Sequence, residues 1–441
     1  MGAVRLHPDW RYVNGDTLFN RFTLEVRGCT DRERAYIESV ESGDPVDDPE
    51  VRRRLREESI ITESEDPDSL LPEYEQRAKR TDDIDVHRIR FYVTERCNMG
   101  CPGCFVRFKY RNDEDFQNSD KRKAERTVDF LREENEGDSF QIHFLGGEPL
   151  IGFELIEHTV SYAEEVCEET DPEFSLTTNA TIVTEEIAEY LDEKDFTVGV
   201  SFDGDEELND QSRMYMDDSG TYEDAVEGFE LLKEHMDDGV GILVTPQPLN
   251  IDVLSDVTEK LVDRLDPDGL TINDPFHSDG TWEVDGRKFA EELKPIVELC
   301  EREKIPLISP LSQVLKALGR KEPKVQTLTT QERNFSCAVS VDGRICYHIM
   351  NYDEELFPNP IEEQSDERFE QWATYSGYQH EECRNCIALN TCGGPDPIES
   401  YYGTGHVDEL ELNPERCKFY KHMTGWVASK LSDAEAELDP A

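Results

Sequence analysis

Ile89-Arg90-Phe91-Tyr92-Val93-Thr94 leads into the loop Cys97-Asn98-Met99-Gly100-Cys101-Pro102-Gly103-Cys104. The first segment is predicted to be a strand, and the three cysteines follow it with three and then two residues between them. Three thiolates cannot complete a tetrahedral metal site. They can hold three irons of an iron–sulfur cube and leave the fourth open for a ligand that is not protein. Two simpler interpretations remain: a zinc site that borrows a fourth ligand, and cysteines that are only buried.

The segments after Val86 alternate between strand and helix patterns. The predicted strands are Ile89–Val93, Phe140–Leu145, Phe174–Thr177, Val198–Phe202, Val240–Thr245 and Leu270–Ile272. Such βα steps favour an α/β fold with parallel strands and helical crossovers, either open or closed as a barrel. In these folds chemistry collects at the carboxyl ends of the strands, and the cysteine loop lies at such an end.

The composition limits the partners and the compartment. The 441 residues include 46 basic and 100 acidic side chains, for a formal charge of −54. This charge is tolerable where salt screens it, so we expect a halophilic-type surface and no electrostatically driven binding to nucleic acid or an anionic membrane. No apolar run approaches the ~20 residues of a membrane span. We therefore predict a cytoplasmic protein, in which twelve cysteines point to metal or redox chemistry.

The chain is predicted to divide into five parts. Residues 1–85 form a small module and linker, in which the Thr30–Glu33 capping box, a second helix with Val51 and Leu55, and a strand at Ile60–Thr62 suggest a winged-helix-like unit. The alternative is a scaffolding extension. Residues 86–302 carry the alternating segments, 303–336 form a linker leading away from the sheet, 337–425 form a cysteine-rich domain, and 426–441 form a tail.

The second predicted strand runs into Leu145-Gly146-Gly147-Glu148-Pro149. Here the chain resembles the radical S-adenosylmethionine (SAM) enzymes, whose cluster motif matches the cysteine triad and whose GGEP motif matches Gly146–Pro149. The resemblance implies a partial (β/α)6 TIM-like barrel with a [4Fe–4S] cluster on Cys97, Cys101 and Cys104. It also implies that SAM binds the open iron, with its amino group placed by Gly146, Gly147, Glu148 and Pro149. One electron would cleave the sulfonium, and the 5′-deoxyadenosyl radical would abstract a substrate hydrogen.

Two further segments fit this family. Thr177-Thr178-Asn179 resembles its Thr-Asn-Gly segment, although Ala180 stands in place of glycine. Ser201-Phe202-Asp203-Gly204, with Arg213 following, resembles its Ser-x-Asp-Gly segment. The resemblance implies that Asn179, Ser201, Asp203 and Arg213 contact the cofactor. The alternative for each is a strand-end cap or a surface ion pair.

A second group of cysteines lies near the carboxyl end. Cys383-x2-Cys386-x5-Cys392, with Cys417 farther on, resembles the SPASM extension of the same superfamily and implies at least one auxiliary [4Fe–4S] cluster. Cys337 and Cys346 resemble its opening pair and are further candidate metal ligands, while Asp396 occupies the position of a missing cysteine. Structural zinc is the competing interpretation, because four cysteines with a CxxC also suit zinc.

The resemblance also bears on the reaction. SPASM-bearing members act mostly on peptides or proteins, so the first hypothesis is an oxidoreductase-type peptide maturase that takes its electron from a donor such as a ferredoxin or flavodoxin. Tyr347 stands where sulfatase-maturing members have an aspartate base, which ranks formylglycine formation below other peptide modification. The second hypothesis is a radical SAM enzyme for a small cofactor precursor. The third is a non-catalytic iron–sulfur or zinc protein.

Overall fold

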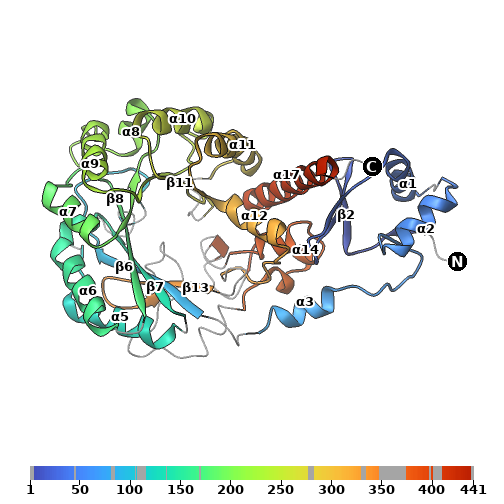
Figure 1. Ribbon diagram of the computed structural model, residues 1–441, viewed down its shortest axis with the longest axis horizontal. Coiled ribbons are helices and arrows are strands. Elements are labelled where there is room, and N and C mark those ends of the chain that lie inside the picture. Colours follow the sequence, from blue (N-terminus) through green and yellow to red (C-terminus); the bar gives the residue numbers. More distant parts are fainter. Residues whose placement is uncertain are drawn as a thin grey trace.

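The computed structural model describes residues 4–43, 46–80, 85–104, 106, 116–135, 137–167, 170–276, 283–328, 334–346, 374–396, 399–400 and 410–438. A strongly curved sheet lies at one end of the molecule with helices around its outside (Figure 1). The carboxyl-terminal segments lie beside the open edge of this sheet, and the amino-terminal unit lies at the far end.

The curved sheet has the order β12-β11-β10-β9-β8-β7-β6-β13-β14. In the described residues all neighbours pair in parallel except β13 and β14. The strands are β6 (Asp85–Thr94), β7 (Ser139–Gly146), β8 (Asp171–Thr178), β9 (Thr197–Ser201), β10 (Val240–Val244), β11 (Gly269–Ile272), β12 (Leu307–Ile308), β13 (Asn334–Val339) and β14 (Ile345–Cys346). The six predicted strands are thus confirmed as β6 to β11, and the α/β class with a parallel, barrel-like sheet is confirmed with them.

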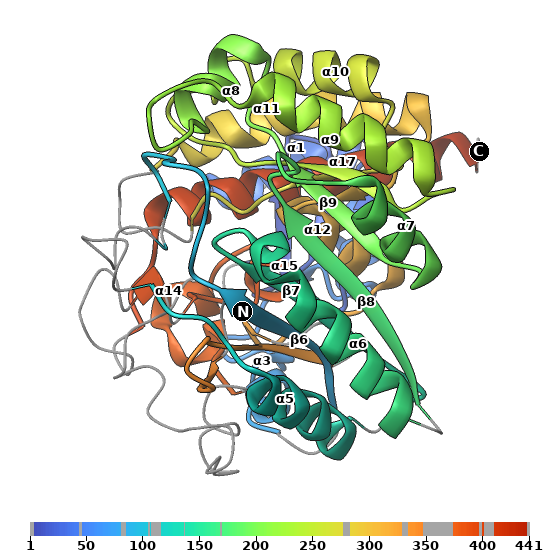
Figure 2. The ribbon, with the colours of Figure 1, turned by 90° about the vertical axis from the view of Figure 1, so that its left-hand side faces the viewer.

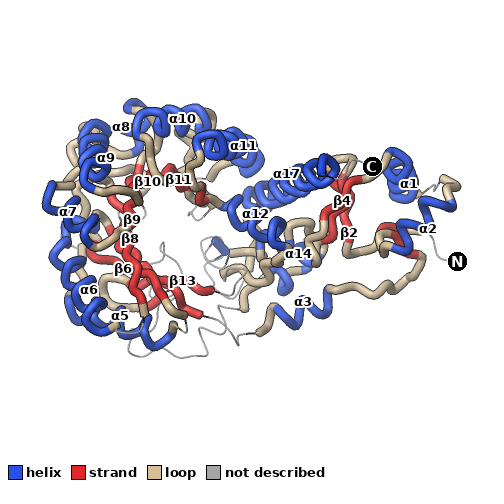
Figure 3. The backbone as a smooth tube through the Cα atoms, viewed as in Figure 1, coloured by secondary structure: helices blue, strands red, loops and turns tan. Residues whose placement is uncertain are grey.

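Helices cover the convex face of the sheet, as Figures 2 and 3 show. They are α5 (Lys121–Glu134), α6 (Phe153–Val166), α7 (Glu185–Glu193), α8 (Glu206–Ser212), α9 (Tyr222–His235), α10 (Leu254–Leu265) and α11 (Gly286–Glu303). A further helix, α12 (Pro310–Arg320), follows β12 and lies toward the centre of the molecule (Figure 1). Residues of the strands that face the covering helices are apolar and buried: Phe144 of β7 lies with ring centroids 6.5 Å from Phe174 and 5.9 Å from Phe196. Burial of these rings holds the helices on the sheet. We call the sheet with its helices the half-barrel.

Alternate residues of the same strands face the concave side, and several are polar. Arg90 of β6 pairs with His143 of β7, and His143 pairs with Ser175 of β8, so these three lie in one row across the sheet. Arg88 lies one step earlier on the same face of β6. The convex face of the sheet, under the helices, is therefore apolar, and the concave face is polar and partly basic.

Residues 303–336, predicted as a linker leading away from the sheet, add to the sheet instead. They contain β12, which pairs with β11, all of α12, and the start of β13, which returns to pair with β6. The sequence pattern missed both strands because β12 has only two residues and β13 follows a long stretch without alternation. The predicted domain boundaries remain predictions.

The amino-terminal unit contains more strand than predicted. It has β1 (Arg5–Leu6), β2 (Trp10–Val13), β3 (Thr17–Asn20), β4 (Val26–Gly28), α1 (Asp31–Glu41), α2 (Pro49–Glu57), β5 (Ile61–Thr62) and α3 (Leu71–Arg77). The Thr30–Glu33 capping box at α1 and the following helix and strand are confirmed. The antiparallel sheet β2-β3-β4 was not predicted. The winged-helix comparison stays a prediction.

One long carboxyl-terminal helix contacts both the half-barrel and the amino-terminal unit. It is α17 (Pro414–Leu438), which follows the short elements η4 (Gly377–Gln379), α14 (Glu381–Arg384) and α15 (Leu389–Cys392). Phe419 of α17 stacks on Phe289 of α11 with centroids 4.8 Å apart, and Asn14 Nδ2 donates to the Gly425 carbonyl at 3.0 Å. The helix thus lies between the half-barrel and β3-β4, and residues 426–438, predicted as a tail, continue it. None of the helices among the described residues has the length and apolar character needed to cross a bilayer.

Candidate active site

The cysteine loop begins directly beyond the carboxyl end of β6. Backbone contacts hold it against the segment that follows α8: Gly100 N donates to the Met214 carbonyl at 2.7 Å, and Met99 forms a bridge with Tyr215. Within the loop, Cys104 N donates to the Cys101 carbonyl at 3.2 Å. The loop is therefore fixed at both sides over the mouth of the half-barrel.

The structure brings the three thiols of this loop together. Burial raises the pKa of Cys97 to about 12, and the charges of Glu148, Cys101 and Cys104 act in the same direction. Burial also raises the pKa of Cys101, although Arg213 opposes the rise. These charge contributions mean that the three thiols lie close together, where a bound metal would supply the positive charge that stabilises thiolates.

The described residues contain no cluster of three histidine, cysteine or acidic side chains arranged to hold a single metal ion. This finding does not conflict with a cluster site. Each thiolate of an iron–sulfur cube binds a different iron, so the sulfurs lie farther apart than the ligands of one zinc ion. The half-buried set of Cys97, Cys101 and Cys104 fits the cube better than the zinc interpretation.

Gly146 and Gly147 are needed by the protein's own backbone. A Cβ atom on Gly146 would overlap the Thr94 carbonyl oxygen, and one on Gly147 would overlap the carbonyls of Glu95 and Arg96. Gly147 N donates to the Thr94 carbonyl at 2.7 Å. The space beside their Cα atoms is filled by the end of β6. They dock the end of β7 on the residues that precede Cys97.

Glu148 is a buried clamp between two strand ends. Its carboxylate accepts hydrogen bonds from Leu150 N at 3.2 Å, Thr178 Oγ1 at 2.7 Å and Asn179 N at 2.8 Å. Burial raises its pKa to about 7, and these three donors limit the rise. Pro149 occupies the first turn of the 3-10 helix η2 (Pro149–Gly152), as predicted. The carboxylate thus joins the end of β7 to the end of β8.

Asn179 reaches the cysteine loop from β8. Its Nδ2 donates to Asn98 Oδ1 at 2.9 Å and lies 3.9 Å from the Cys97 sulfur. The next residue, Ala180, has φ of 61°, in the left-handed region that glycine favours. The glycine of the family motif thus corresponds to a real backbone requirement, which this chain meets with alanine.

Arg213 and Asp203 form a buried ion pair on the other side of the thiols. Arg213 Nε lies 2.9 Å from Asp203 Oδ2. Burial lowers the pKa of Arg213, but the charges of Asp203 and Cys101 outweigh burial and leave the pKa raised. Ser201 is the last residue of β9 and lies half-buried on the concave face. The structure therefore brings Asn179, Arg213 and Asp203 close to the thiols, and it puts Ser201 at a strand end.

The four cysteines of the carboxyl-terminal group also come together. Cys383 lies in α14, Cys386 in the following turn, Cys392 at the end of α15 and Cys417 in the first turn of α17. Burial raises the pKa of Cys383, and the charges of the other three thiols add to the rise. Burial raises the pKa of Cys417 to about 11, with contributions from Cys392 and Cys386. Four thiols from separate elements thus lie near enough for their charges to act on one another.

Of the other candidate ligands, Cys337 does not join this group. Cys337 lies in β13, is fully buried in the core, and has Arg90 and Glu134 as its charged neighbours. Asp396 caps the turn at Glu399, whose N donates to it at 3.3 Å. The backbone of Cys346 lies in β14, and its side chain, like Tyr347, lies outside the described residues.

Sequence reasoning missed several residues that shape the site. Asn98, inside the cysteine motif, joins the loop to the end of β8 through Asn179 and through Thr181 Oγ1 at 2.7 Å. Asn250 Nδ2 donates to the carbonyls of Asp203 and Thr245 and holds the loop after β9. A polar residue beside a motif was the only signal for Asn98, and nothing near Asn250 indicated its role.

Comparison with known proteins points to one family. A family model described as the radical SAM superfamily matches residues 91–261. This part of the chain is a radical SAM domain. The matched residues run from β6 into α10 and include the three-cysteine loop and the strand ends around it. A radical SAM fold implies a [4Fe–4S] cluster and SAM, and the residues at the mouth of the half-barrel fit that pair.

Three known proteins are similar to this chain. An uncharacterised protein of Methanocaldococcus jannaschii is 36% identical over 143 residues, which are 32% of this chain and 47% of that protein. This chain thus matches about half the length of that relative. An uncharacterised protein of Archaeoglobus fulgidus is 27% identical over 87% of this chain and 89% of its own. The structure of native anSMEcpe with bound AdoMet and the Kp18Cys peptide has a TM-score of 0.65 at 19% identity, covering 79% of this chain and 98% of that one. At that identity the likeness concerns the fold.

Proposed function

We propose that this radical SAM protein is a peptide or protein maturase that abstracts a hydrogen atom from its substrate. The observation that carries the proposal is the pairing of an incomplete set of three thiols, at the mouth of the half-barrel, with a separate complete set of four. When bound, the [4Fe–4S] cluster and SAM supply the electron and the 5′-deoxyadenosyl radical for this reaction. The residues of the chain bind, orient and shield these groups.

The three-thiol loop would hold the cluster through Cys97, Cys101 and Cys104. Asn179 is close enough to donate to a thiolate sulfur, which would adjust the reduction potential of the cluster. Arg213, held by Asp203, adds a positive charge that favours the thiolate state of Cys101. The fixed backbone of Gly146 and Gly147 and the hydroxyl of Ser201 are the proposed contacts for SAM.

The four-thiol group would hold an auxiliary [4Fe–4S] cluster in a SPASM-like domain. With Cys383, Cys386, Cys392 and Cys417 all contributed by protein, every iron would be coordinated, which suits electron transfer better than substrate binding. A zinc ion is the alternative occupant. Cys337 would have to leave the core to become a ligand, so a second auxiliary cluster has little support.

A peptide substrate agrees with the fold. The solved structure of anSMEcpe described above contains a peptide together with AdoMet. The amino-terminal unit would then contact the peptide. That unit shares the core with α17 through Val13, Phe19 and Leu24, so its deletion would expose apolar surface and would not test binding cleanly.

The test is anaerobic reconstitution with iron and sulfide, followed by reduction with dithionite in the presence of SAM. We expect 5′-deoxyadenosine from the wild-type protein and at least a ~100-fold loss in the Cys97→Ala variant. Cys29→Ala is the matched control, because Cys29 lies half-buried in the amino-terminal unit, far from both thiol groups in sequence. Absence of 5′-deoxyadenosine from a wild-type protein with full iron content, under any reductant, would reject the proposal.

A further inference from the structure

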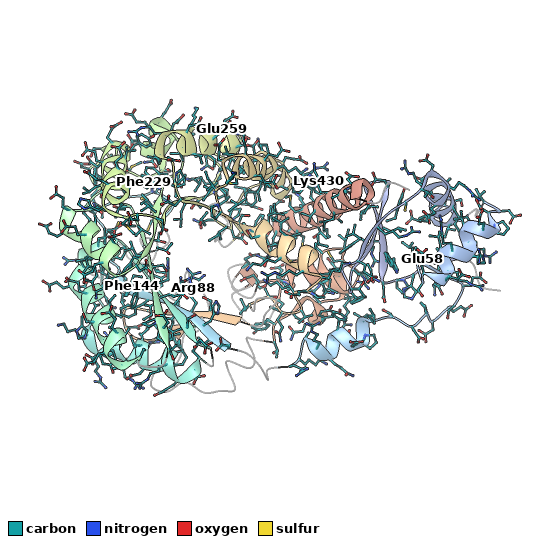
Figure 4. The ribbon with its side chains drawn as sticks, in the orientation of Figure 1. Glu58, Arg88, Phe144, Phe229, Glu259 and Lys430 are labelled. Carbon is teal, nitrogen blue, oxygen red and sulfur yellow. The ribbon has the colours of Figure 1, made fainter. Side chains whose placement is uncertain are left out.

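The concave face of the half-barrel carries positive charge that the proposed chemistry does not use. Arg88 and Arg90 both project from β6 to this face, because Ile89 between them is buried against the helices. Figure 4 labels Arg88, which points to the hollow side of the curved sheet, away from the helices. Arg90 Nη1 donates to Ser336 Oγ of β13 at 2.9 Å.

Arg88 lacks a partner in the described part of the chain. Its Nε atom is buried without a hydrogen bond, and none of the ion pairs between described residues includes its guanidinium. Burial lowers the pKa of Arg88 to about 9, and the nearby charge of Arg90 adds to this effect. A buried cation beside another cation is costly unless an anion joins them.

The neighbouring groups do not supply that anion. His143 lies in the same row, and its two ring nitrogens contact Ser175 Oγ at 2.8 Å and Thr177 Oγ1 at 3.1 Å. Burial lowers the pKa of His143, with Arg88 and Arg90 adding to the shift, so it is a neutral neighbour. Among the described residues no carboxylate charge acts on Arg88, whose pKa is shifted only by burial and by Arg90.

The carboxylates nearest the mouth of the half-barrel are already used. Glu148 accepts three hydrogen bonds from the strand ends, and Asp203 is paired with Arg213. Neither is among the groups whose charge acts on Arg88. By contrast Arg416, a buried arginine of the interior, contacts both Glu399 at 3.0 Å and Asp274 at 3.3 Å.

We propose that Arg88, with Arg90 beside it, binds an oxyanion of the substrate inside the half-barrel. The proposal rests on the proposed function and names its substrate class: a molecule with a carboxylate or phosphate group well away from the reacting carbon. Guanidinium groups recognise both oxyanions through paired N–H donors. Arg88 lies six residues before Thr94 on β6, about 20 Å along a strand from the cysteine loop. That span suits a peptide with an acidic residue, a free carboxyl terminus or a phosphorylated side chain.

The experiment measures anion binding by the reconstituted full-length protein at constant ionic strength in KCl. The probes are N-acetyl-glutamate amide, its neutral partner N-acetyl-glutamine amide, and inorganic phosphate. Binding is followed as the rise in thermal midpoint with probe concentration and checked by calorimetry. We expect saturable binding of the glutamate derivative or of phosphate, and none of the glutamine derivative. The tighter of the two anions identifies the substrate group as carboxylate or phosphate.

Three variants assign the binding to Arg88. Arg88→Gln should weaken anion binding about tenfold or more, because a charged donor pair is lost. Arg88→Lys should recover most of the affinity. Arg27→Gln is the matched control: Arg27 is half-buried and paired with Glu33 at 2.6 Å and Glu58 at 3.1 Å. It should lower the thermal midpoint of the protein without probe and keep wild-type affinity.

Two results would overturn the inference. One is equal binding of the glutamate and glutamine derivatives by the wild-type protein; this measurement does not depend on the folding of any variant. The other is unchanged anion affinity in Arg88→Gln. Because the readout is binding rather than turnover, failure of SAM cleavage would reject the proposed function separately and would leave this measurement standing.

Discussion

The two thiol groups differ in what surrounds them. The three-thiol loop lies at strand ends, where Asn179 and Arg213 approach the sulfurs and the backbone of 94–96 is pressed against two glycines. The four-thiol group lies at a joint, where short helices meet α17 and the amino-terminal unit. One site is short of a ligand and rich in polar neighbours, and the other has a full ligand set. On the function proposed above, the first group would serve chemistry and the second would serve structure and electron transfer.

The joint is built from parts far apart in sequence. Cys383 packs in one apolar cluster with Phe22 and Tyr74 of the amino-terminal unit. Asn390 Nδ2 donates to the Arg21 carbonyl at 2.8 Å, and Arg11 Nη2 donates to the Asn385 carbonyl at 3.1 Å. A metal centre on the four thiols would therefore hold the amino-terminal unit in place as well as α17.

The largest expected effect is on metal content and stability after Cys386→Ser. With one of four ligands lost, we expect the iron of the auxiliary centre to be lost, with a fall of at least about 3 kcal/mol in stability, because metal binding is coupled to folding. Iron and sulfide analysis, together with limited proteolysis of residues 1–80, would measure both effects. The Cys97/Cys101/Cys104 triple variant is the counterpart: it should retain iron on the four-thiol group. Zinc in place of that iron would contradict the cluster assignment.

The next effect concerns the packing under the three-thiol loop. Gly147→Ala places a methyl group on the carbonyls of Glu95 and Arg96, so the residues before Cys97 must move. We expect a loss of about 3 kcal/mol in unfolding free energy and a lower yield of reconstituted cluster. Gly319→Ala is the control, since a Cβ there meets no atom within 4 Å. Equal cluster yields in the two variants would show that the glycine has no role in shaping the loop.

The sequence predicted the parts of this site that local rules determine. The six central strands could be found because apolar residues alternate, and the cysteine spacing and Pro149 at a helix start are local as well. The pairing of β13 with β6 could not be predicted, because the two strands are separated by some 250 residues and the alternation within β13 does not indicate its partner. The reason for Gly146 and Gly147 was also out of reach: it depends on how closely two strand ends approach. Arg88 could not be recognised as unpaired without its surroundings.

A smaller effect is the pH dependence that Glu148 contributes. Its pKa in the folded protein is about 7, above the unfolded value of about 4.3, so folding favours the protonated form. The stability that this group contributes is present below about pH 4 and is lost as the pH rises through 7, by about 3 kcal/mol in all. Urea unfolding of wild type and Glu148→Gln from pH 4.5 to pH 8 should show this slope in the wild type only. Parallel profiles would contradict the assignment.

The smallest effect returns to the strand end beside the thiols. Ala180 has φ of 61° and is buried, so its backbone is in a region where L-residues are strained by about 1 kcal/mol. Ala180→Gly relieves this strain but increases the entropy of the unfolded chain, so we expect a net gain of about 0.5 kcal/mol. Ala188→Gly, in the regular helix α7 and equally buried, should instead lose about 1 kcal/mol or more. Thermal unfolding of the two variants compares them directly. A gain of stability in Ala180→Gly and a loss in Ala188→Gly would show that the glycine of the family motif serves the backbone turn after Asn179, independently of any bound cofactor. A loss of stability in both variants would mean that the methyl group of Ala180 packs well enough to outweigh its strained conformation.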